Sequence, residues 1–193
     1  MSKINVSLAL FAQGHIEEAE KLQREALTSE IRRQGPDHPN SLEMQTYLTA
    51  TLNAEGRYTE AEKLARQTYE AELHIHGPQH THTVNALQQL GIAMAHTQRY
   101  AEASTLFREA IAKQDKSAKQ GDDYSIWYSF ACVAAAADRP DDTLQYLQEA
   151  INRGYKNAEG LMADPDLKDL RSNPKFQQLV GELKSPSVRA QTQ

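Results

Sequence analysis

A 25-residue stretch occurs twice in this chain, and every residue of the first copy precedes its counterpart by 42 positions. The copies are GHIEEAEKLQREALTSEIRRQGPDH at 14–38 and GRYTEAEKLARQTYEAELHIHGPQH at 56–80. Ala103 follows Ala61 at the same distance of 42 residues. A period of this size indicates structural units that stack on their neighbours, because one unit cannot bury its apolar face alone. Stacked repeats typically present an extended binding surface.

Each unit is predicted to be a pair of helices. Between residues 16 and 27, apolar residues recur at steps of three and four, which places them on one stripe of a helix. Gly35-Pro36 ends this helix, since glycine closes helices readily and proline cannot continue one. The same signals predict four helix pairs, over 3–13 and 16–34, 41–55 and 58–75, 83–97 and 100–114, and 124–137 and 140–152.

The repeat changes after the third pair. The polar segment 115–123 has no Gly-Pro stop, and we expect the preceding helix to continue to about Lys119. From Arg153 the repeat stops, and short turns at 158–162 and 166–170 precede a last helix that ends at Leu183. The expected domains are a helix-pair array over 1–153, with units at about 1–35, 39–77, 81–120 and 122–153, a C-terminal capping segment over 154–184 and a disordered tail over 185–193.

Composition and charge argue against several classes of protein. The net charge is −5 and the basic residues are interspersed with acidic ones, which argues against nucleic-acid binding. No apolar run is long enough to span a membrane, so no membrane insertion is expected, and the N-terminal residues fit a repeat helix better than a signal peptide. The single cysteine, Cys132, has apolar neighbours and is expected to be buried. A chain with one cysteine points to a reducing, cytoplasmic location.

Helix pairs with small residues at their crossing points resemble tetratricopeptide repeats (TPRs). The small residues are Ala19, Ala61 and Ala103, and the third unit carries more of the pattern at Leu87, Leu90, Gly91, Met94 and Phe107. The 42-residue period, with GRYTEAE at 56–62 and GPDHPNS at 35–41, looks like the long-helix variant of kinesin light chains and many bacterial proteins, over roughly residues 1–115. This resemblance implies an all-α fold, a right-handed alpha-alpha superhelix (TPR solenoid) of four helix pairs plus a short helical C-terminal cap.

The C-terminal third, 127–180, resembles a terminal unit that follows such repeats in bacterial proteins. Its markers are WYSFAC at 127–132, Gly154-Tyr155, DPDL at 164–167 and NPKF at 173–176. In that setting the array often forms the tail of a larger protein, commonly a serine/threonine kinase, although no kinase motif occurs in this chain. The leading hypothesis is a non-enzymatic module that binds a peptide or protein partner in its concave groove. The alternative is a regulatory or self-associating C-terminal tail of a larger bacterial signalling protein.

In this architecture the first helix of each pair lines the inside of the curve. Helical phase then assigns the candidate groove residues, which are Tyr47, Asn53, Asn85, Gln88, Gln89, Ile92, His96 and Tyr128. Amide and phenol side chains could hydrogen-bond an extended peptide backbone, and the aromatic rings could form side-chain pockets. Kinesin light chain repeats often carry paired asparagines in this helix, and this chain does not, so no particular ligand is implied. The alternative is that these residues face water or the C-terminal segment.

Four histidines, His74, His76, His80 and His82, lie within nine residues of one another. Imidazoles so clustered could bind zinc or nickel. His80 repeats His38, however, and as the linker histidine of the family pattern it is expected to cap or pack the next helix. No cysteine is nearby and no carboxylate shows a recognisable ligand spacing. We therefore expect a structural role and no cofactor, and metal binding through these histidines stays open as a third hypothesis.

No catalytic arrangement is evident in the sequence. The acidic pairs at 122–123 and 141–142 fit helix caps and first turns, where negative charge favours the helix dipole. A calcium-loop spacing, a Ser-His-acid set and a phosphate-binding loop are all absent. We expect no enzyme activity. A homo-oligomer stays open, because the four alanines at 134–137 give a low-relief helix surface that could meet a second copy.

Overall fold

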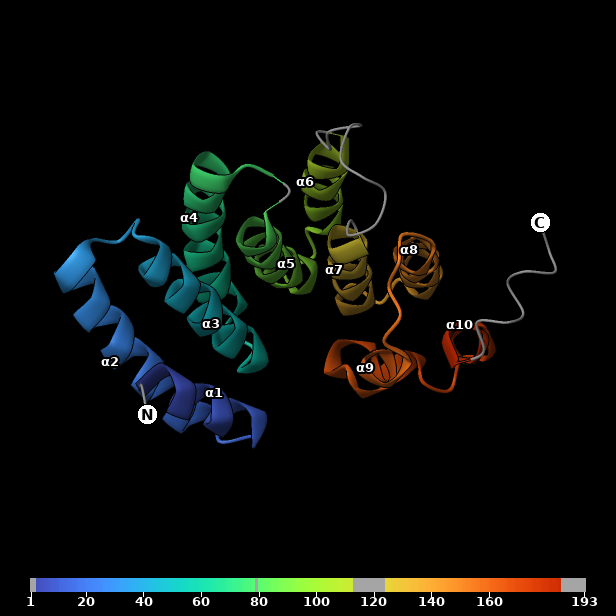
Figure 1. The fold of residues 1–193 in the computed structure, drawn as a ribbon, viewed down its shortest axis with the longest axis horizontal. Coiled ribbons are helices and arrows are strands. Elements are labelled where there is room, and N and C mark those ends of the chain that lie inside the picture. The colour runs from blue at the N-terminus through green and yellow to red at the C-terminus, as the bar shows by residue number, and fades with distance from the viewer. Residues whose placement is uncertain (1–2, 79, 113–123, 185–193) are drawn as a thin grey trace. The chain divides into compact units, whose positions relative to one another are not determined.

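The computed structural model describes residues 3–78, 80–112 and 124–184. Every regular element in these residues is a helix, labelled α1 to α10, with one 3-10 helix, η1 (Figure 1). The chain divides into two compact units, Met1–Lys113 and Gln114–Gln193. Among the described residues no helix is long and apolar enough to cross a lipid bilayer.

Unit 1 consists of three helix pairs. They are α1 (Lys3–Ala12) with α2 (Ile16–Gln34), α3 (Pro39–Ala54) with α4 (Tyr58–His76), and α5 (Thr81–His96) with α6 (Tyr100–Ala112). The sequence predicted all six helices, with described ends that differ by two residues at most. The expected continuation of α6 to about Lys119 lies outside the described residues.

The turns within the pairs close with backbone hydrogen bonds that require a left-handed residue. The N–H of Gly56 donates to the Asn53 carbonyl at 3.0 Å, and the N–H of Arg57 donates to the Leu52 carbonyl at 2.9 Å. This is a Schellman motif, and Gly56 has the positive φ, 74°, that the motif needs. In the third pair Gln98 takes this position with φ 62°. A residue with a Cβ atom is strained in that conformation.

Small residues allow the helices of each pair to approach closely. Ala19, Ala61 and Ala103 are fully buried, as the sequence predicted. Ala61 belongs to a core cluster with Leu27, Leu48, Leu52 and Ala93. These residues come from α2, α3, α4 and α5, so the core continues from one pair into the next, as stacked repeats require.

Ion pairs also repeat every 42 residues, and they join successive pairs. Arg57, which precedes α4, donates to Glu20 of α2 at 2.7 Å. Arg99, which precedes α6, donates to Glu62 of α4 at 2.5 Å. Both arginines are about 40% exposed, at 41% and 39%, so solvent screens these pairs. Their main effect is to fix how each pair is placed against the preceding one.

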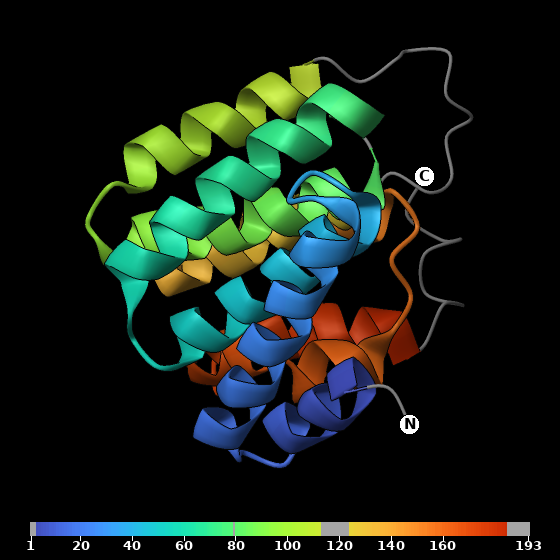
Figure 2. The same ribbon diagram turned by 90° about the vertical axis from the view of Figure 1, so that its left-hand side faces the viewer.

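The first helices of the pairs lie on the inside of the curve of unit 1. α1 contacts α3, and α3 contacts α5. α2, α4 and α6 lie on the outer side in Figure 1, and Figure 2 shows unit 1 from the side of α2. A row of helices that is closer together on one side is curved toward that side. The inner surface of unit 1 is therefore formed by α1, α3 and α5.

Unit 2 contains the fourth pair and the C-terminal segment. Its elements are α7 (Tyr124–Ala136), α8 (Pro140–Asn152), α9 (Ala158–Ala163), η1 (Pro165–Leu170) and α10 (Pro174–Lys184). The short elements begin at side-chain caps: Asn157 accepts from the N–H of Gly160 at 2.8 Å, and Asp164 accepts from the N–H of Asp166 at 2.9 Å. The expected disordered tail, 185–193, lies outside the described residues.

The core of unit 2 combines aromatic stacking with close helix packing. The rings of Phe130 in α7 and Tyr146 in α8 stack with centroids 3.9 Å apart. Cys132 is fully buried, as the sequence predicted, and burial raises the pKa of its thiol. Element η1 packs against α7, so within unit 2 the C-terminal segment covers part of the first helix of the fourth pair.

Candidate functional site

The α3 part of the inner surface carries a phenol that is bonded to a carboxylate. The Tyr47 hydroxyl donates to Glu43 Oε1 at 2.6 Å, one helical turn away. This hydrogen bond and partial burial raise the pKa of Tyr47 to about 12. Both side chains are half-buried. The pair presents a fixed phenol with a negatively charged partner.

Asn53 and Gln89, both predicted groove residues, bond to each other across the inner surface. Asn53 Nδ2 donates to the Gln89 backbone carbonyl at 3.0 Å and to Gln89 Oε1 at 3.1 Å. Asn53 is only 9% exposed, and its own Oδ1 is buried without a hydrogen-bond partner in the described part of the chain. This contact links α3 of one pair to α5 of the next. It positions the Gln89 side chain and leaves Asn53 little access to a ligand.

Three further candidates lie along one stripe of α5. Asn85 is exposed, Gln88 is half-buried, and Ile92 is buried at 8% exposure. Their spacing of three and four residues keeps them on one side of the helix. Ile92 therefore belongs mainly to the packed layer, while Asn85 and Gln88 provide amide groups at the surface.

Two predicted residues are engaged elsewhere. The His96 imidazole stacks on Tyr58 at the start of α4, with ring centroids 4.2 Å apart, and burial lowers the pKa of His96. Tyr128 belongs to unit 2, where its hydroxyl donates to Asp164 Oδ2 at 2.5 Å and its ring stacks on Tyr155. Within unit 2 the side chain of Tyr128 therefore contacts the C-terminal segment.

Five of these polar residues lie on the first helices α3 and α5 of unit 1. We call them the inner polar patch: Glu43, Tyr47, Asn85, Gln88 and Gln89. Together they offer hydrogen-bond donors, acceptors and one negative charge, which is the chemistry that a peptide backbone with a basic side chain can use.

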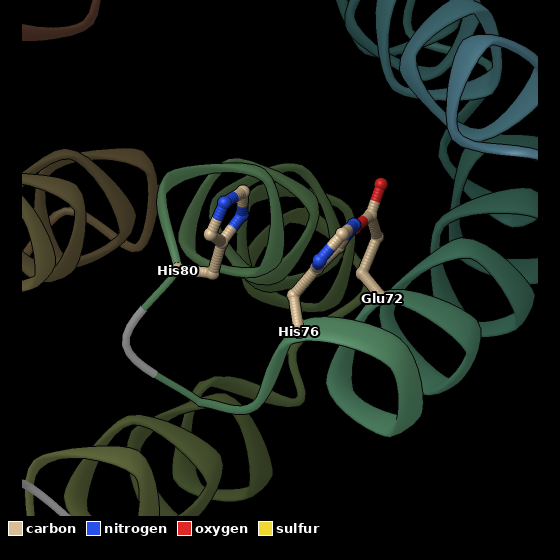
Figure 3. Close-up of side chains that lie close together, drawn as sticks. All are labelled: Glu72, His76 and His80. Atoms are coloured by element: carbon tan, nitrogen blue, oxygen red, sulfur yellow. The ribbon is translucent and has the colours of Figure 1, made fainter.

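The histidine-rich linker between α4 and α5 has a structural role that the sequence predicted. His80 caps α5, because its Nδ1 accepts from the N–H of His82 at 3.3 Å. The structure also places Glu72, a buried carboxylate near the end of α4, beside His76 and His80 (Figure 3). The i,i+4 spacing of Glu72 and His76 is the sequence signal that could have identified this carboxylate.

Comparison with known families agrees with this architecture. The tetratricopeptide repeat family model matches residues 1–71 and 44–116, which together cover more than half of the chain. The chain belongs to the tetratricopeptide repeat family. The TPR fold is a non-enzymatic scaffold for protein–protein interaction.

Solved structures show the same fold. A structure described as kinesin light chain nearly identical TPR-like repeats from Podosopora anserina has a TM-score of 0.62 at 15% identity, and the match covers 100% of this chain and 96% of that one. A variant of the same protein gives a TM-score of 0.63 at 16% identity, with the same coverage. At this identity the likeness shows the fold alone. No curated protein matches the chain significantly.

A second family model, described as A/B hydrolase-like, N-terminal domain, matches residues 83–191, and over this stretch the chain belongs to that family too. The name refers to a domain and assigns no catalytic residue. The described part of this stretch contains helices and no strand, whereas the hydrolase nucleophile of α/β enzymes sits at a strand-to-helix turn. The match therefore supplies no active site.

Proposed function

We propose that unit 1 binds an extended segment of a protein partner along its inner polar patch. The observation that carries this proposal is the position of the patch: exposed or half-buried amide, phenol and carboxylate groups lie on the first helices, α3 and α5, of two successive pairs. An extended peptide has unpaired N–H and C=O groups along its whole length, and amide side chains can bond either kind.

The pair of Glu43 and Tyr47 gives this surface a chemical preference. The carboxylate lies on the inner helix α3, and among the described contacts its neighbour is the neutral Tyr47 hydroxyl rather than a basic group. A ligand with lysine or arginine at this point would form a charge-assisted hydrogen bond, which is stronger than a neutral one. We therefore expect the preferred peptides to carry a basic residue.

Selection of peptides from a random displayed library tests the proposal. Peptides recovered on the full chain are measured by fluorescence anisotropy against the parent and against the double variant Tyr47→Ala with Gln88→Ala. We expect the double variant to lose affinity by about tenfold, since it removes two neutral hydrogen-bonding groups that contribute about 0.5–1.5 kcal/mol each. The melting temperature is measured in parallel to confirm that the variant is folded.

A matched control uses the outer surface. Lys63 and Gln67 are exposed on α4, and the control variant is Lys63→Ala with Gln67→Ala. This control should bind selected peptides as the parent does. If the two double variants bind equally well, or if the peptide contacts map to α2, α4 and α6, the inner polar patch is not the binding surface.

The alternative hypothesis, a regulatory or self-associating tail of a larger signalling protein, receives no specific support from the geometry. The second family model describes the N-terminal domain of hydrolase-like proteins, and its description does not mention a signalling protein. We therefore place peptide binding first.

A further inference from the structure

The two linkers that join successive pairs in unit 1 share a glycine stop and a histidine cap and differ in the side chains around them. Gly35 and Gly77 both have positive φ, 93° and 78°, and both end the preceding helix. His38 and His80 both cap the following helix, with Nδ1 accepting a backbone N–H at 3.2 and 3.3 Å. The 42-residue offset therefore allows the two linkers to be compared residue by residue.

In the first linker a buried carboxylate is fully supplied with donors. Glu30 is 8% exposed and accepts from Arg33 Nη2 at 2.7 and 2.8 Å. It also accepts from the side-chain amides of Gln34 and Asn40. These donors hold the pKa of Glu30 below its ordinary value, with Arg33 making the largest contribution. This carboxylate links α2 to α3 through its hydrogen bonds.

In the second linker the equivalent carboxylate has lost those donors. Glu72 occupies the position of Glu30, while Ile75, His76 and His82 replace the arginine and the two amide residues. Glu72 is 1% exposed, and its Oε2 has no hydrogen-bond partner among the described residues. His76 Nε2 lies 3.6 Å away, beyond hydrogen-bond distance. Burial raises the pKa of Glu72.

The imidazoles converge on this carboxylate. Glu72, His76 and His80 each place one ligand atom within 4.8 Å of the other two. Figure 3 shows the three side chains. The rings of His76 and His80 stack with centroids 4.3 Å apart, and the ring of His82 lies 5.2 Å from that of His80.

We propose that Glu72, His76 and His80 bind a divalent cation of the zinc class, with His82 beside them as a candidate fourth ligand. Two imidazole nitrogens and one carboxylate oxygen are a ligand set that zinc uses in proteins. A bound cation satisfies the otherwise unpartnered Glu72 oxygen. Because Glu72 and His76 belong to α4 and His80 precedes α5, the ion ties the second pair to the third.

The three ligand atoms lie farther apart than a bound zinc ion allows, so the side chains must move together when the ion binds. Zinc–nitrogen bonds of about 2.0–2.1 Å require tetrahedral ligand atoms about 3.4 Å apart, so the side chains contract from their present separations. His80 uses Nδ1 as the cap acceptor, and a metal at its Nε2 puts the proton on Nδ1 and breaks that bond. The loss of a cap opposes binding, so we expect micromolar affinity and not the much tighter binding of preformed four-ligand sites.

The experiment titrates the tag-free full chain with zinc and with cobalt(II), by calorimetry, melting temperature and cobalt absorption. The decisive variant is His76→Gln with His82→Asn, which gives the second linker the amide residues that Gln34 and Asn40 provide in the first. The first linker shows that this residue set suits the same backbone. We expect this variant to fold and to lose zinc affinity by about tenfold or more.

Exposed histidines outside the cluster provide the control. His15 and His74 are exposed, and the variant His15→Ala with His74→Ala should bind zinc as the parent does. Metal binding should also weaken as the pH falls, because protons compete with the metal for the ligand atoms. Undetectable binding, or equal binding by the parent and the His76→Gln, His82→Asn variant, would overturn the proposal.

Discussion

The turn within the third helix pair needs a residue in the left-handed conformation, and Gln98 takes the place that Gly56 has in the second pair. Its N–H donates to the Ala95 carbonyl at 3.1 Å and the next N–H, of Arg99, donates to the Met94 carbonyl at 2.7 Å. The same two bonds close the turn at Gly56, so both positions adopt the same left-handed conformation. Gln98 is exposed, and no side-chain hydrogen bond of Gln98 occurs among the described contacts. The substitution Gln98→Gly should therefore remove strain and little else.

The size of the effect follows from two opposing terms. A residue with a Cβ atom costs about 1–2 kcal/mol in the left-handed region. Glycine loses more backbone freedom on folding, which costs about 0.5–1 kcal/mol relative to alanine. The difference predicts that Gln98→Gly raises the free energy of unfolding by about 0.5–1 kcal/mol. For a chain of this size, that gain corresponds to a rise of roughly 1–4 °C in the melting temperature.

The reverse substitution, Gly56→Gln, is the matched control. A Cβ atom at Gly56 would meet only the Tyr58 ring, at 3.9 Å or more, which is ordinary van der Waals contact. Any destabilisation therefore comes from the backbone, and it should be similar in size and opposite in sign. Urea unfolding followed by far-UV circular dichroism gives both free energies. Trp127 fluorescence reports on unit 2 separately, because this tryptophan is the only one in the chain. If Gln98→Gly is neutral while Gly56→Gln destabilises, the strain assigned to Gln98 is wrong.

Two further predictions concern unit 2. Asp166 is exposed as a residue, but desolvation of its carboxyl and the nearby Asp164 raise its pKa from 3.8 to about 6. The folded form therefore holds this proton more tightly, and the stability that the proton contributes is present below pH 3.8 and lost as the pH rises through about 6. Asp166→Asn should flatten the dependence of unit 2 stability on pH in that window, measured as urea midpoints by Trp127 fluorescence, and an unchanged pH dependence would contradict this assignment. The Cys132 thiol is fully buried with a raised pKa, so a disulfide reagent should label it only as fast as unit 2 opens. The labelling rate should rise with urea in parallel with the Trp127 signal, and rapid labelling in buffer would show that the thiol is accessible.

The sequence determined the repeat architecture because its signals are local and repeated. The spacing of 42 residues, the Gly35 stop and the alanine crossing points act through backbone conformation and close helix contact, which depend on residue type and spacing. The described ends of the helices that the sequence predicted therefore agree to within about two residues, whereas α9 and η1 were expected as turns. Burial of Cys132 could be predicted for a similar reason, since its immediate neighbours are apolar.

The candidate site depended on side-chain pairing between helices, which spacing alone does not specify. Helical phase placed Asn53 and Gln89 on the inner surface, but only the packing of α3 against α5 joined them to each other. Tyr128 has the same phase, and in the structure it bonds to Asp164 of the C-terminal segment.

The linkers show the same division between local and tertiary information. The sequence identified His80 as a capping residue from its repeat of His38, and the structure confirmed the cap. That the Glu72 carboxylate is buried without a donor was decided by the fold, because its burial depends on how α4 packs against α5. Sequence by itself determined where the helices and turns of this protein lie. Tertiary structure decided which polar groups are paired and which are left to bind something else, because partners distant in sequence meet only after the helices pack.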